Sequence, residues 1–417
     1  MNLRPLIAIS SKQALFFAVF LVMYEFIVYM ANDMIMPGML TVVRTFHAPE
    51  SHIATSLTAY VLGGASLQLL LGPISDAYGR RPVMLFGAGL FFVCTIVIAC
   101  SFSIDQFLVA RFFQGMGLCF ISVIGYATLQ EIFAEMDAVR LVAIMANVSI
   151  SAPLVGPLLG AVVINYTGWR LIFVGIGLIA LVAWWGLWRF MPESVGQTKN
   201  NGEKILRIAF SSRTILANYV TLLSNRRFLL ATVAHGLLNI PCVAWIALAP
   251  VIMVSDARLS VIQYGIWQIP VFSAAIAGNW ILHYWTHRKT LHQILTLGSM
   301  LIGMSLFAMV GLTWYSHASY LGLMPGIIGY FLALGITHAP LDRLILFSTP
   351  VSKGMTSALM TMMSMSIQAI GIEFANRVYL WQKNQYFAFY CLAMGLLYGI
   401  FMVMAFRGDK SLGKDAL

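Results

Sequence analysis

Charged residues are scarce in this sequence: Asp, Glu, Lys and Arg together make up 10% of its 417 residues. A soluble domain usually carries about 25% charged residues. The hydrophobic share is 60%, so too few polar side chains remain to cover a surface in water. The scarcity of charge therefore argues against a soluble enzyme and against a soluble nucleic-acid-binding protein, although the formal net charge is +10.

The motifs of common enzyme and metal sites are missing as well. The eight histidines form no HExxH pattern, and the chain has no GxSxG and no glycine-rich phosphate loop. The five cysteines form no CxxC pair, and all lie in apolar runs. We therefore expect the cysteines to be small buried side chains, and we expect no enzymatic activity, no metal site and no organic cofactor.

What the sequence has in abundance is long apolar runs of about 20 residues, the length that a helix needs to cross a bilayer. A transmembrane barrel would instead have short alternating segments. The sequence predicts an all-α polytopic membrane protein with twelve transmembrane helices. These predicted spans are 14–40, 52–72, 83–102, 105–131, 139–165, 169–190, 227–254, 261–284, 290–312, 319–346, 354–380 and 384–406.

The longest polar stretch, 191–226, divides the twelve predicted spans into six and six. This layout is typical of transporters with two lobes and a central linker. We expect an N-terminal lobe over 1–190, a cytoplasmic linker over 191–226 and a C-terminal lobe over 227–417. Basic and apolar residues alternate irregularly over 203–224, which favours an amphipathic helix on the membrane surface there.

The basic residues predict the orientation of the chain. With the N-terminus inside, nineteen of the 25 Lys and Arg residues fall in cytoplasmic segments, five fall outside and one, Arg111, lies within a span. This asymmetry follows the positive-inside rule and predicts that both termini are cytoplasmic. It also accounts for the net positive charge through anionic lipid, without a nucleic-acid partner. Residues 1–12 lack a cleavage site of small residues, so we expect the first apolar run to be retained.

Two carboxylates lie within the first predicted span, where a charge is costly and usually faces a cavity or a partner. Glu25 and Asp33 are eight residues apart, which places them roughly 12 Å apart along a helix and about 80° apart around it. Both can therefore face one cavity. A carboxyl group in such a place is a workable proton carrier. The alternative is a carboxylate that braces a neighbouring helix.

Arg111 lies six residues into the fourth predicted span, at a depth similar to that of Asp33. An arginine near an acid can couple the protonation of that acid to a conformational change. Gln114, one turn further on, can share the same network. The alternative is a structural role in which Arg111 binds backbone carbonyl groups.

Other polar positions within spans have less specific interpretations. Glu373 and Arg377 are four residues apart, which favours an ordinary ion pair on a helix surface. His235 and His338 lie in the seventh and tenth spans, where each is either a proton relay or a hydrogen-bonded helix contact.

A short loop between the second and third spans contains an acid and two arginines. It reads Gly72-Pro-Ile-Ser-Asp76-Ala-Tyr-Gly79-Arg80-Arg81, and charges so placed can lock one conformation and release it in another. The segment resembles the signature loop of the major facilitator superfamily, G-x-L-A-D-R-x-G-R-R. The resemblance implies a gating role for Gly72, Asp76, Gly79, Arg80 and Arg81. Ala77 departs from it, because the family usually has a basic residue there.

Two further motifs are similar to those of the same family. Arg111-Phe-Phe-Gln114-Gly resembles the R-x-x-Q-G motif of the fourth helix, whose arginine is tied to proton coupling in the family. The run from Ala152 to Gly160 resembles the fifth-helix motif of antiporters, with Pro153, Gly156, Pro157 and Gly160. Small residues at this spacing allow close helix packing, and the prolines permit a kink.

The first span is similar to that of twelve-helix drug/proton antiporters within this superfamily, through Tyr24-Glu25-Phe26 and Asn32-Asp33-Met34-Ile35-Met36-Pro37. In that group the residues matching Glu25 and Asp33 bind protons and substrate in the cavity of the N-terminal lobe. The resemblance implies protons as the coupling ion, with Glu25, Asp33 and Arg111 as the coupling residues.

The resulting hypothesis is an exporter in the bacterial inner membrane that exchanges protons for lipophilic, cationic or neutral drugs. We expect it to act as a monomer on small molecules. Methionine is soft and adaptable, and the chain has 24 of them. Side chains expected at the substrate are Glu25, Tyr29, Asn32, Asp33, Met34, Gln114, Leu118, Met145, Asn147, Leu237 and Trp245. The alternatives are an exporter of a specific metabolite or siderophore on the same fold, and a proton-coupled nutrient importer, against which the antiporter motif argues.

Overall fold

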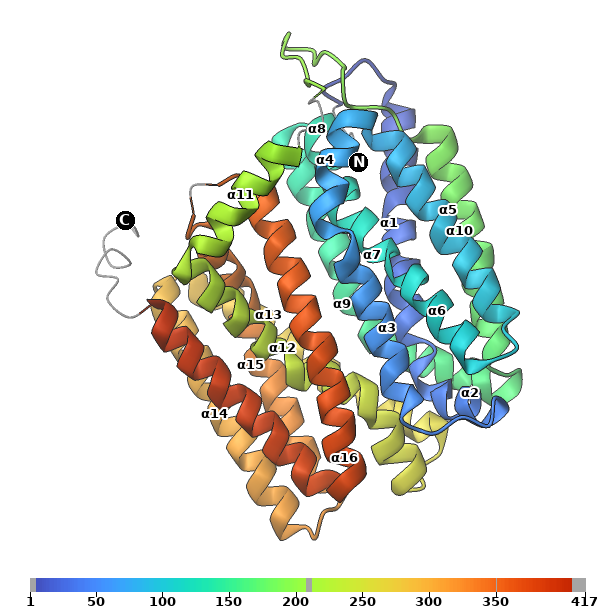
Figure 1. The fold of residues 1–417 in the computed structure, drawn as a ribbon, viewed down its shortest axis with the longest axis vertical. Coiled ribbons are helices and arrows are strands. Elements are labelled where there is room, and N and C mark those ends of the chain that lie inside the picture. The colour runs from blue at the N-terminus through green and yellow to red at the C-terminus, as the bar shows by residue number, and fades with distance from the viewer. Residues whose placement is uncertain (1–4, 208–211, 350, 407–417) are drawn as a thin grey trace. The chain divides into compact units, whose positions relative to one another are not determined.

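The computed structural model describes residues 5–207, 212–349 and 351–406, and every regular element in these ranges is a helix (Figure 1). Eleven helices in the described ranges are long and apolar enough to cross a membrane. A twelfth span results if α3 (His52–Ser66) and α4 (Gln68–Tyr78), bent by 41° at their junction, are counted as one. The all-α fold with twelve spans, predicted from the apolar runs, is thereby confirmed.

The chain divides into two compact units. The first comprises Met1–Ala48 and Ala59–Ala217, and the second comprises Pro49–Thr58 and Asn218–Leu417. The polar segment that follows the sixth span is therefore divided: its part up to Ala217 groups with the first unit, and its part from Asn218 groups with the second. Our predicted lobe boundaries at residues 190 and 227 remain a prediction.

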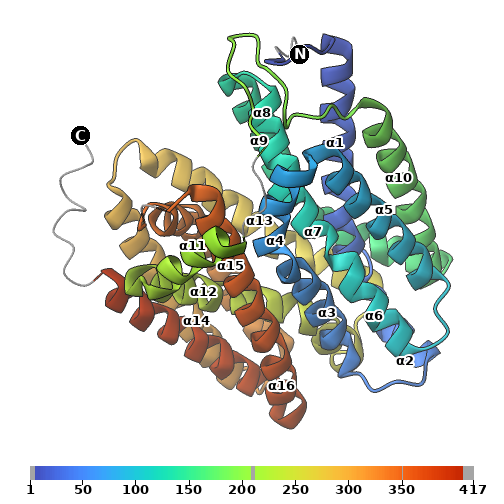
Figure 2. The ribbon, with the colours of Figure 1, turned by 45° about the horizontal axis from the view of Figure 1, so that its top comes forward.

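In the first unit, α1 packs against α9 and α10, and α10 packs against α5 (Figures 1 and 2). The fourth span is divided into α6, α7, η2 and α8, and η2 is a π-helical stretch that widens the helix. The first unit contains α4 and the part of α3 from Ala59 onward. Its other elements are α1 (Ser11–Asp33), η1 (Met36–Gly38), α2 (Met39–Thr45), α5 (Arg80–Ala99), α6 (Ile104–Gly115), α7 (Gly117–Cys119), η2 (Phe120–Gly125), α8 (Tyr126–Ile132), α9 (Glu135–Tyr166) and α10 (Trp169–Phe190).

In the second unit, α12 packs against α16, and α15 packs against both α13 and α14. Its elements are α12 (Arg226–Pro250), η3 (Val251–Asp256), α13 (Val261–Thr286), α14 (Leu291–Tyr315), α15 (Tyr320–Leu346) and α16 (Lys353–Phe406). The helix α16 is 54 residues long and contains two spans, Lys353–Leu380 and Lys383–Ala405. The left-handed backbone of Lys383 (φ +65°) marks the junction between them.

Polar caps determine where several spans begin. Ser10 accepts a hydrogen bond from the backbone N–H of Gln13 at the start of α1. Both α13 and α14 begin with reciprocal capping boxes, Ser260 with Gln263 and Thr290 with Gln293. Each box satisfies backbone donors that the first turn of a helix leaves unpaired. These caps lie at the edges of apolar runs, so the polar side chains at which the helices begin also mark the boundaries of the membrane spans.

The linker helix is shorter than we predicted. The helix α11 covers Ser212–Ser224, whereas the prediction began at residue 203. Residues 203–207 are not helical, because Lys204 forms an isolated β-bridge with Thr198 and Gly196 donates to the carbonyl of Ile205. Two apolar residues used in the prediction, Ile208 and Phe210, lie outside the described residues.

The expectation that all five cysteines are buried was partly wrong. Cys94, Cys119 and Cys391 are buried, but Cys242 is half-buried and Cys100 is exposed. Cys100 terminates α5, at the edge of a span. An apolar stretch of sequence does not show whether a side chain lies inside the helix bundle, at the end of a helix or on the side that faces lipid.

Candidate functional site

Glu25 lies in the middle of α1 and is 1% exposed. Its Oε1 accepts hydrogen bonds from the hydroxyl groups of Tyr126 and Ser149, both at 2.9 Å. Its Oε2 is buried without a hydrogen-bond partner. No ion pair joins Glu25 to a basic side chain in the described part of the chain. The carboxyl group is thus held in place by neutral donors and has one oxygen free to carry a proton or to accept from a ligand.

Asp33 ends α1 and is 5% exposed. Its Oδ1 accepts from the side-chain amide of Asn32 at 3.2 Å. The oxygen of that amide accepts from Arg111 at 2.7 Å. Asn32 therefore connects the acid and the base, and no direct Asp33–Arg111 ion pair is found among the described residues. The charge of Asp33 therefore acts on Arg111 through the polarised side-chain amide of Asn32.

Arg111 is fully buried on α6 and is fixed by several groups at once. Besides Asn32, its guanidinium donates to the carbonyl of Ala31 at 3.2 Å and to Gln114 Oε1 at 2.8 Å. The ring of Tyr60 lies 4.4 Å from its central carbon, a cation–π distance. The side chain binds a backbone carbonyl group and is linked to Asp33 through Asn32, and its role in proton coupling remains a prediction.

The antiporter motif on α9 packs directly against the end of α1. A Cβ atom on Gly156 would lie 2.7 Å from the Cβ of Asp33, and one on Gly160 would overlap the carbonyl oxygen of Met34. The two glycines are one turn apart and let the backbones of α1 and α9 touch. Pro153 and Pro157 lie on the same helix. Two glycines of the motif thus border the acid at the end of α1.

The loop motif forms a charge network within the first unit. Arg80 pairs with Asp76 at 2.7 Å and with Glu131 at 2.8 Å. Ser75 accepts from Arg80 as well, while the guanidinium of Arg81 donates to the carbonyl of Trp188. The network closes through Arg80 without a basic side chain at Ala77, where the sequence departs from the family pattern.

Glu193, which follows α10, caps the helix that begins at Arg80. Its carboxylate accepts from the backbone N–H groups of Arg80 and Arg81, at 2.9 and 3.2 Å. Negative charge at a helix N-terminus is stabilised by the unpaired N–H groups and the helix dipole. Gly79 has φ +109°, and a Cβ atom there would overlap the Glu193 carboxylate. This contact explains the second glycine of the loop, whereas a Cβ on Gly72 would meet only Val123, at 3.9 Å.

The structure places the expected substrate side chains unevenly. Tyr29 lies one turn from both Glu25 and Asp33 on α1, and Tyr29, Met34 and Leu118 are half-buried. Met145 is buried, and Asn147 is exposed on α9. In the second unit Leu237 is buried, and Trp245 is fully buried with its N–H bonded to Gln268 at 3.0 Å. Their contact with a substrate remains a prediction.

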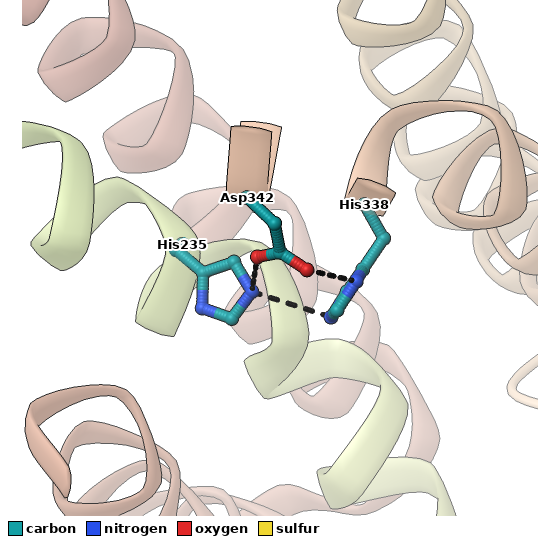
Figure 3. A group of neighbouring side chains, drawn as sticks. All are labelled: His235, His338 and Asp342. Atoms are coloured by element: carbon teal, nitrogen blue, oxygen red, sulfur yellow. Dashed lines mark hydrogen bonds and ion pairs between the residues drawn. The ribbon is translucent and has the colours of Figure 1, made fainter. Parts of the chain in front are cut away.

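Of the other polar positions, His235 and His338 contact each other, and Asp342 joins them (Figure 3). The predicted ion pair between Glu373 and Arg377 is not formed. Glu373 Oε1 is buried without a hydrogen-bond partner, and Arg377 is exposed. A spacing of four residues on a helix is therefore not sufficient for an ion pair here.

Sequence reasoning missed several partners that the structure brings together. Tyr126 and Ser149 bind Glu25, Glu193 caps α5, and Asp342 completes the histidine pair. A signal existed for Asp342, because it lies four residues after His338, on the same face of a helix. No spacing in the sequence connects Tyr126 or Ser149 with Glu25, because they lie on other helices.

Apolar spans in two units, with buried charges on the first and fourth spans, define a polytopic membrane transporter. The chain belongs to the Major Facilitator Superfamily, whose family model matches residues 21–372. The family resemblance of the loop and helix motifs is thereby confirmed.

Curated relatives match nearly the whole chain. The multidrug transporter MdfA of Yersinia pestis bv. Antiqua is 42% identical over 407 residues, covering 97% of both chains. The multidrug transporter MdfA of Escherichia coli O6:H1 is 40% identical over 404 residues, covering 97% of this chain and 96% of that protein. The expected similarity to bacterial multidrug transporters of this superfamily is confirmed by these matches.

Solved structures with the same fold are more distant in sequence. A bacterial homologue of the human lysosomal transporter Spinster superposes with a TM-score of 0.71 at 12% identity, covering 95% of this chain and 97% of that one. A D-xylose–proton symporter superposes with a TM-score of 0.70 at 16% identity, covering 93% and 97%. At such identities the similarity concerns the fold alone.

Proposed function

We propose that this chain is a drug exporter of the bacterial inner membrane, driven by protons and working by alternating access. Relatives 40–42% identical over nearly the whole chain are named multidrug transporters. The substrates that best suit its apolar, methionine-rich spans are lipophilic and cationic or neutral.

The observation that carries this proposal is the state of the two acids on α1. Glu25 and Asp33 are buried, and in the described part of the chain neither is paired directly with a basic side chain. A buried carboxylate without a paired cation is costly, and a proton or a cationic ligand removes that cost. One site that accepts either of them makes the two binding events compete, and this competition is the basis of exchange.

The transport cycle uses these groups in turn. With the cavity open inward, deprotonated Glu25 or Asp33 accepts substrate from the cytoplasm or the inner leaflet. After the change of access, a proton arriving from outside neutralises the acid, so the substrate is released. Arg111 senses the charge of Asp33 through Asn32, and the contact of Gly156 and Gly160 with α1 carries the change to α9.

The proposal is tested in inside-out membrane vesicles with cationic, neutral and anionic compounds. Wild type is compared with Glu25→Gln and Asp33→Asn, and with Glu373→Gln as a matched control for an acid elsewhere in a span. We expect substrate-driven proton movement with wild type and with the control. Asp33→Asn should abolish coupled transport, and Glu25→Gln should abolish at least that of cations.

Two outcomes would contradict the proposal. If Asp33→Asn retains full transport and proton release, the coupling site is wrong. If no compound in the panel drives protons, the chain is a narrow exporter of a metabolite or siderophore, or an importer. Movement of substrate and protons across the membrane in the same direction would identify the importer.

We also propose that both termini are cytoplasmic and that the monomer is the functional form. The asymmetry of basic residues supports the orientation. The orientation is tested by introducing single cysteines in place of Arg170 and Lys289 and labelling them from either side of the membrane. The two positions are expected on opposite sides. Transport by vesicles reconstituted at one protein per vesicle tests whether the monomer is the functional form.

A further inference from the structure

A cluster of metal-binding residue types lies in the second unit, apart from the acids on α1. His235 on α12 and His338 and Asp342 on α15 each offer one ligand atom, and these atoms lie within 4.8 Å of one another (Figure 3). The two Nε2 atoms are 3.2 Å apart, and Asp342 Oδ1 is 3.0 Å from Nε2 of His235. Bonds of about 2.0–2.1 Å at a tetrahedral metal place two nitrogens about 3.4 Å apart, close to the separation found here.

Both imidazoles are oriented by a second contact. Nδ1 of His235 is 2.8 Å from Ser364 Oγ, and Nδ1 of His338 is 3.2 Å from Asp342 Oδ2. Metal-binding histidines usually use their other ring nitrogen in this way, which holds the ring in place. Figure 3 shows both rings and the carboxylate directed toward one point.

The hydrogen-bond partners are compatible with a tautomer pair in which both histidines carry their proton on Nδ1. Ser364 Oγ accepts from Gln368 at 3.0 Å and is placed to accept from Nδ1–H of His235 as well. Asp342 Oδ2 accepts from Nδ1–H of His338. In this tautomer pair both Nε2 atoms direct lone pairs at the same space. Either a proton on one Nε2 or a metal cation between the two satisfies this arrangement.

The charge and exposure of the cluster fit a cation from solution. Asp342 has ion pairs only with the two histidines among the described residues, whereas Asp256 in the same unit pairs with Lys383. The side chains of His338 and Asp342 are 44% and 29% exposed. The acid therefore has no permanent countercharge, and the open side leaves room for water at a remaining coordination position.

We propose that His235, His338 and Asp342 bind a divalent transition-metal ion of the Zn²⁺ class, with Ser364 as a positioning residue. Two imidazoles, one carboxylate and water form a donor set that such ions take up, and imidazole selects them over Mg²⁺ and Ca²⁺. The bound ion joins α12 to α15. This site goes beyond the proposed drug export and does not depend on it.

The test measures binding of Zn²⁺ and Co²⁺ to the full chain in detergent, purified with a tag free of histidine. His283 and His287 on α13 have ring centres 5.3 Å apart, so all measurements use a background in which both are alanine. Calorimetry with Zn²⁺ should give one site per chain, and Co²⁺ should give a visible absorption band. Each of His235→Gln, His338→Gln and Asp342→Asn should lower Zn²⁺ affinity roughly a hundredfold or more, and Ser364→Ala about tenfold.

Unchanged melting temperatures without metal identify the variants that remain folded, and three separate ligand variants keep the test decisive if one is not. Asp33→Asn serves as the matched control: it should bind Zn²⁺ as wild type does, even though its coupled transport is lost. Absence of the single site in the parent protein would overturn the proposal. So would equal Zn²⁺ affinity or an equal Co²⁺ band in the folded ligand variants.

Discussion

The two units each bury polar groups among apolar helices, but they use different chemistry. In the first unit Asp33 is linked to Arg111, which is fully buried and has four distinct partners. In the second, the ion pairs of Asp342 within the described ranges are with histidines, which are charged only after they take up a proton. The first site contains its own permanent cation, whereas the second acquires positive charge from outside the protein.

The network around Arg111 therefore has a fixed positive charge, whereas the charge of the histidine cluster can change. The guanidinium of Arg111 stays charged at any physiological pH, so only the acids near it can change state. Three of its four partners, Ala31, Tyr60 and Gln114, are buried, and Asn32 is half-buried. The histidine cluster is partly exposed, so water can replace a lost partner there. We therefore expect substitutions in the first site to affect folding more strongly than those in the second.

The largest expected contrast is between Arg111→Lys and Asp342→Asn. Lysine keeps the charge but not the planar fork, so at least one buried acceptor loses its donor, at about 1–3 kcal/mol for each. Asp342→Asn leaves a polar side chain beside water and should cost less than about 1 kcal/mol. Equilibrium unfolding in mixed micelles compares the two. Equal losses would remove the distinction between an enclosed and an accessible site.

A second contrast concerns how closely the helices approach. Gly160→Ala forces a methyl group into the backbone of α1 and should destabilise by about 1–3 kcal/mol, with loss of transport. For Gly236→Ala on α12 the nearest atoms are side-chain atoms of Ile367, at 3.0 Å, and this substitution should cost less. Gly175→Ala on α10 has open space and serves as the control, neutral or stabilising by about 0.4–1 kcal/mol. Similar melting temperatures for all three would show that the α1–α9 contact is not specially close.

The smallest expected effects come from single hydrogen bonds. Tyr126→Phe removes one donor to Glu25, and Ser364→Ala removes the contact to His235. Each should change stability by about 0.5–1.5 kcal/mol. Tyr126→Phe should alter the concentration of cationic drug needed for half-maximal transport, whereas Ser364→Ala should not. A shift of the transport curve by Ser364→Ala would mean that the two polar sites are not separate in function.

Much of the fold followed from periodicity and charge. Runs of about 20 apolar residues located the spans because a bilayer tolerates no unpaired backbone groups and so requires complete helices. The helix over 203–224 was predicted less well, since a short amphipathic segment is decided by local pairing such as the bridge from Thr198 to Lys204.

The sequence by itself determined which residues are expensive to bury, since Glu25, Asp33 and Arg111 lie in apolar runs whatever the packing. Only the tertiary structure decided their partners. Asn32 stands between Asp33 and Arg111, and Tyr126 and Ser149 meet Glu25 from other helices. Likewise, Asp342 completes the pair of histidines only because α12 packs beside α15. A hydrogen bond between helices depends on their rotation and approach, which the spacing along one helix does not encode.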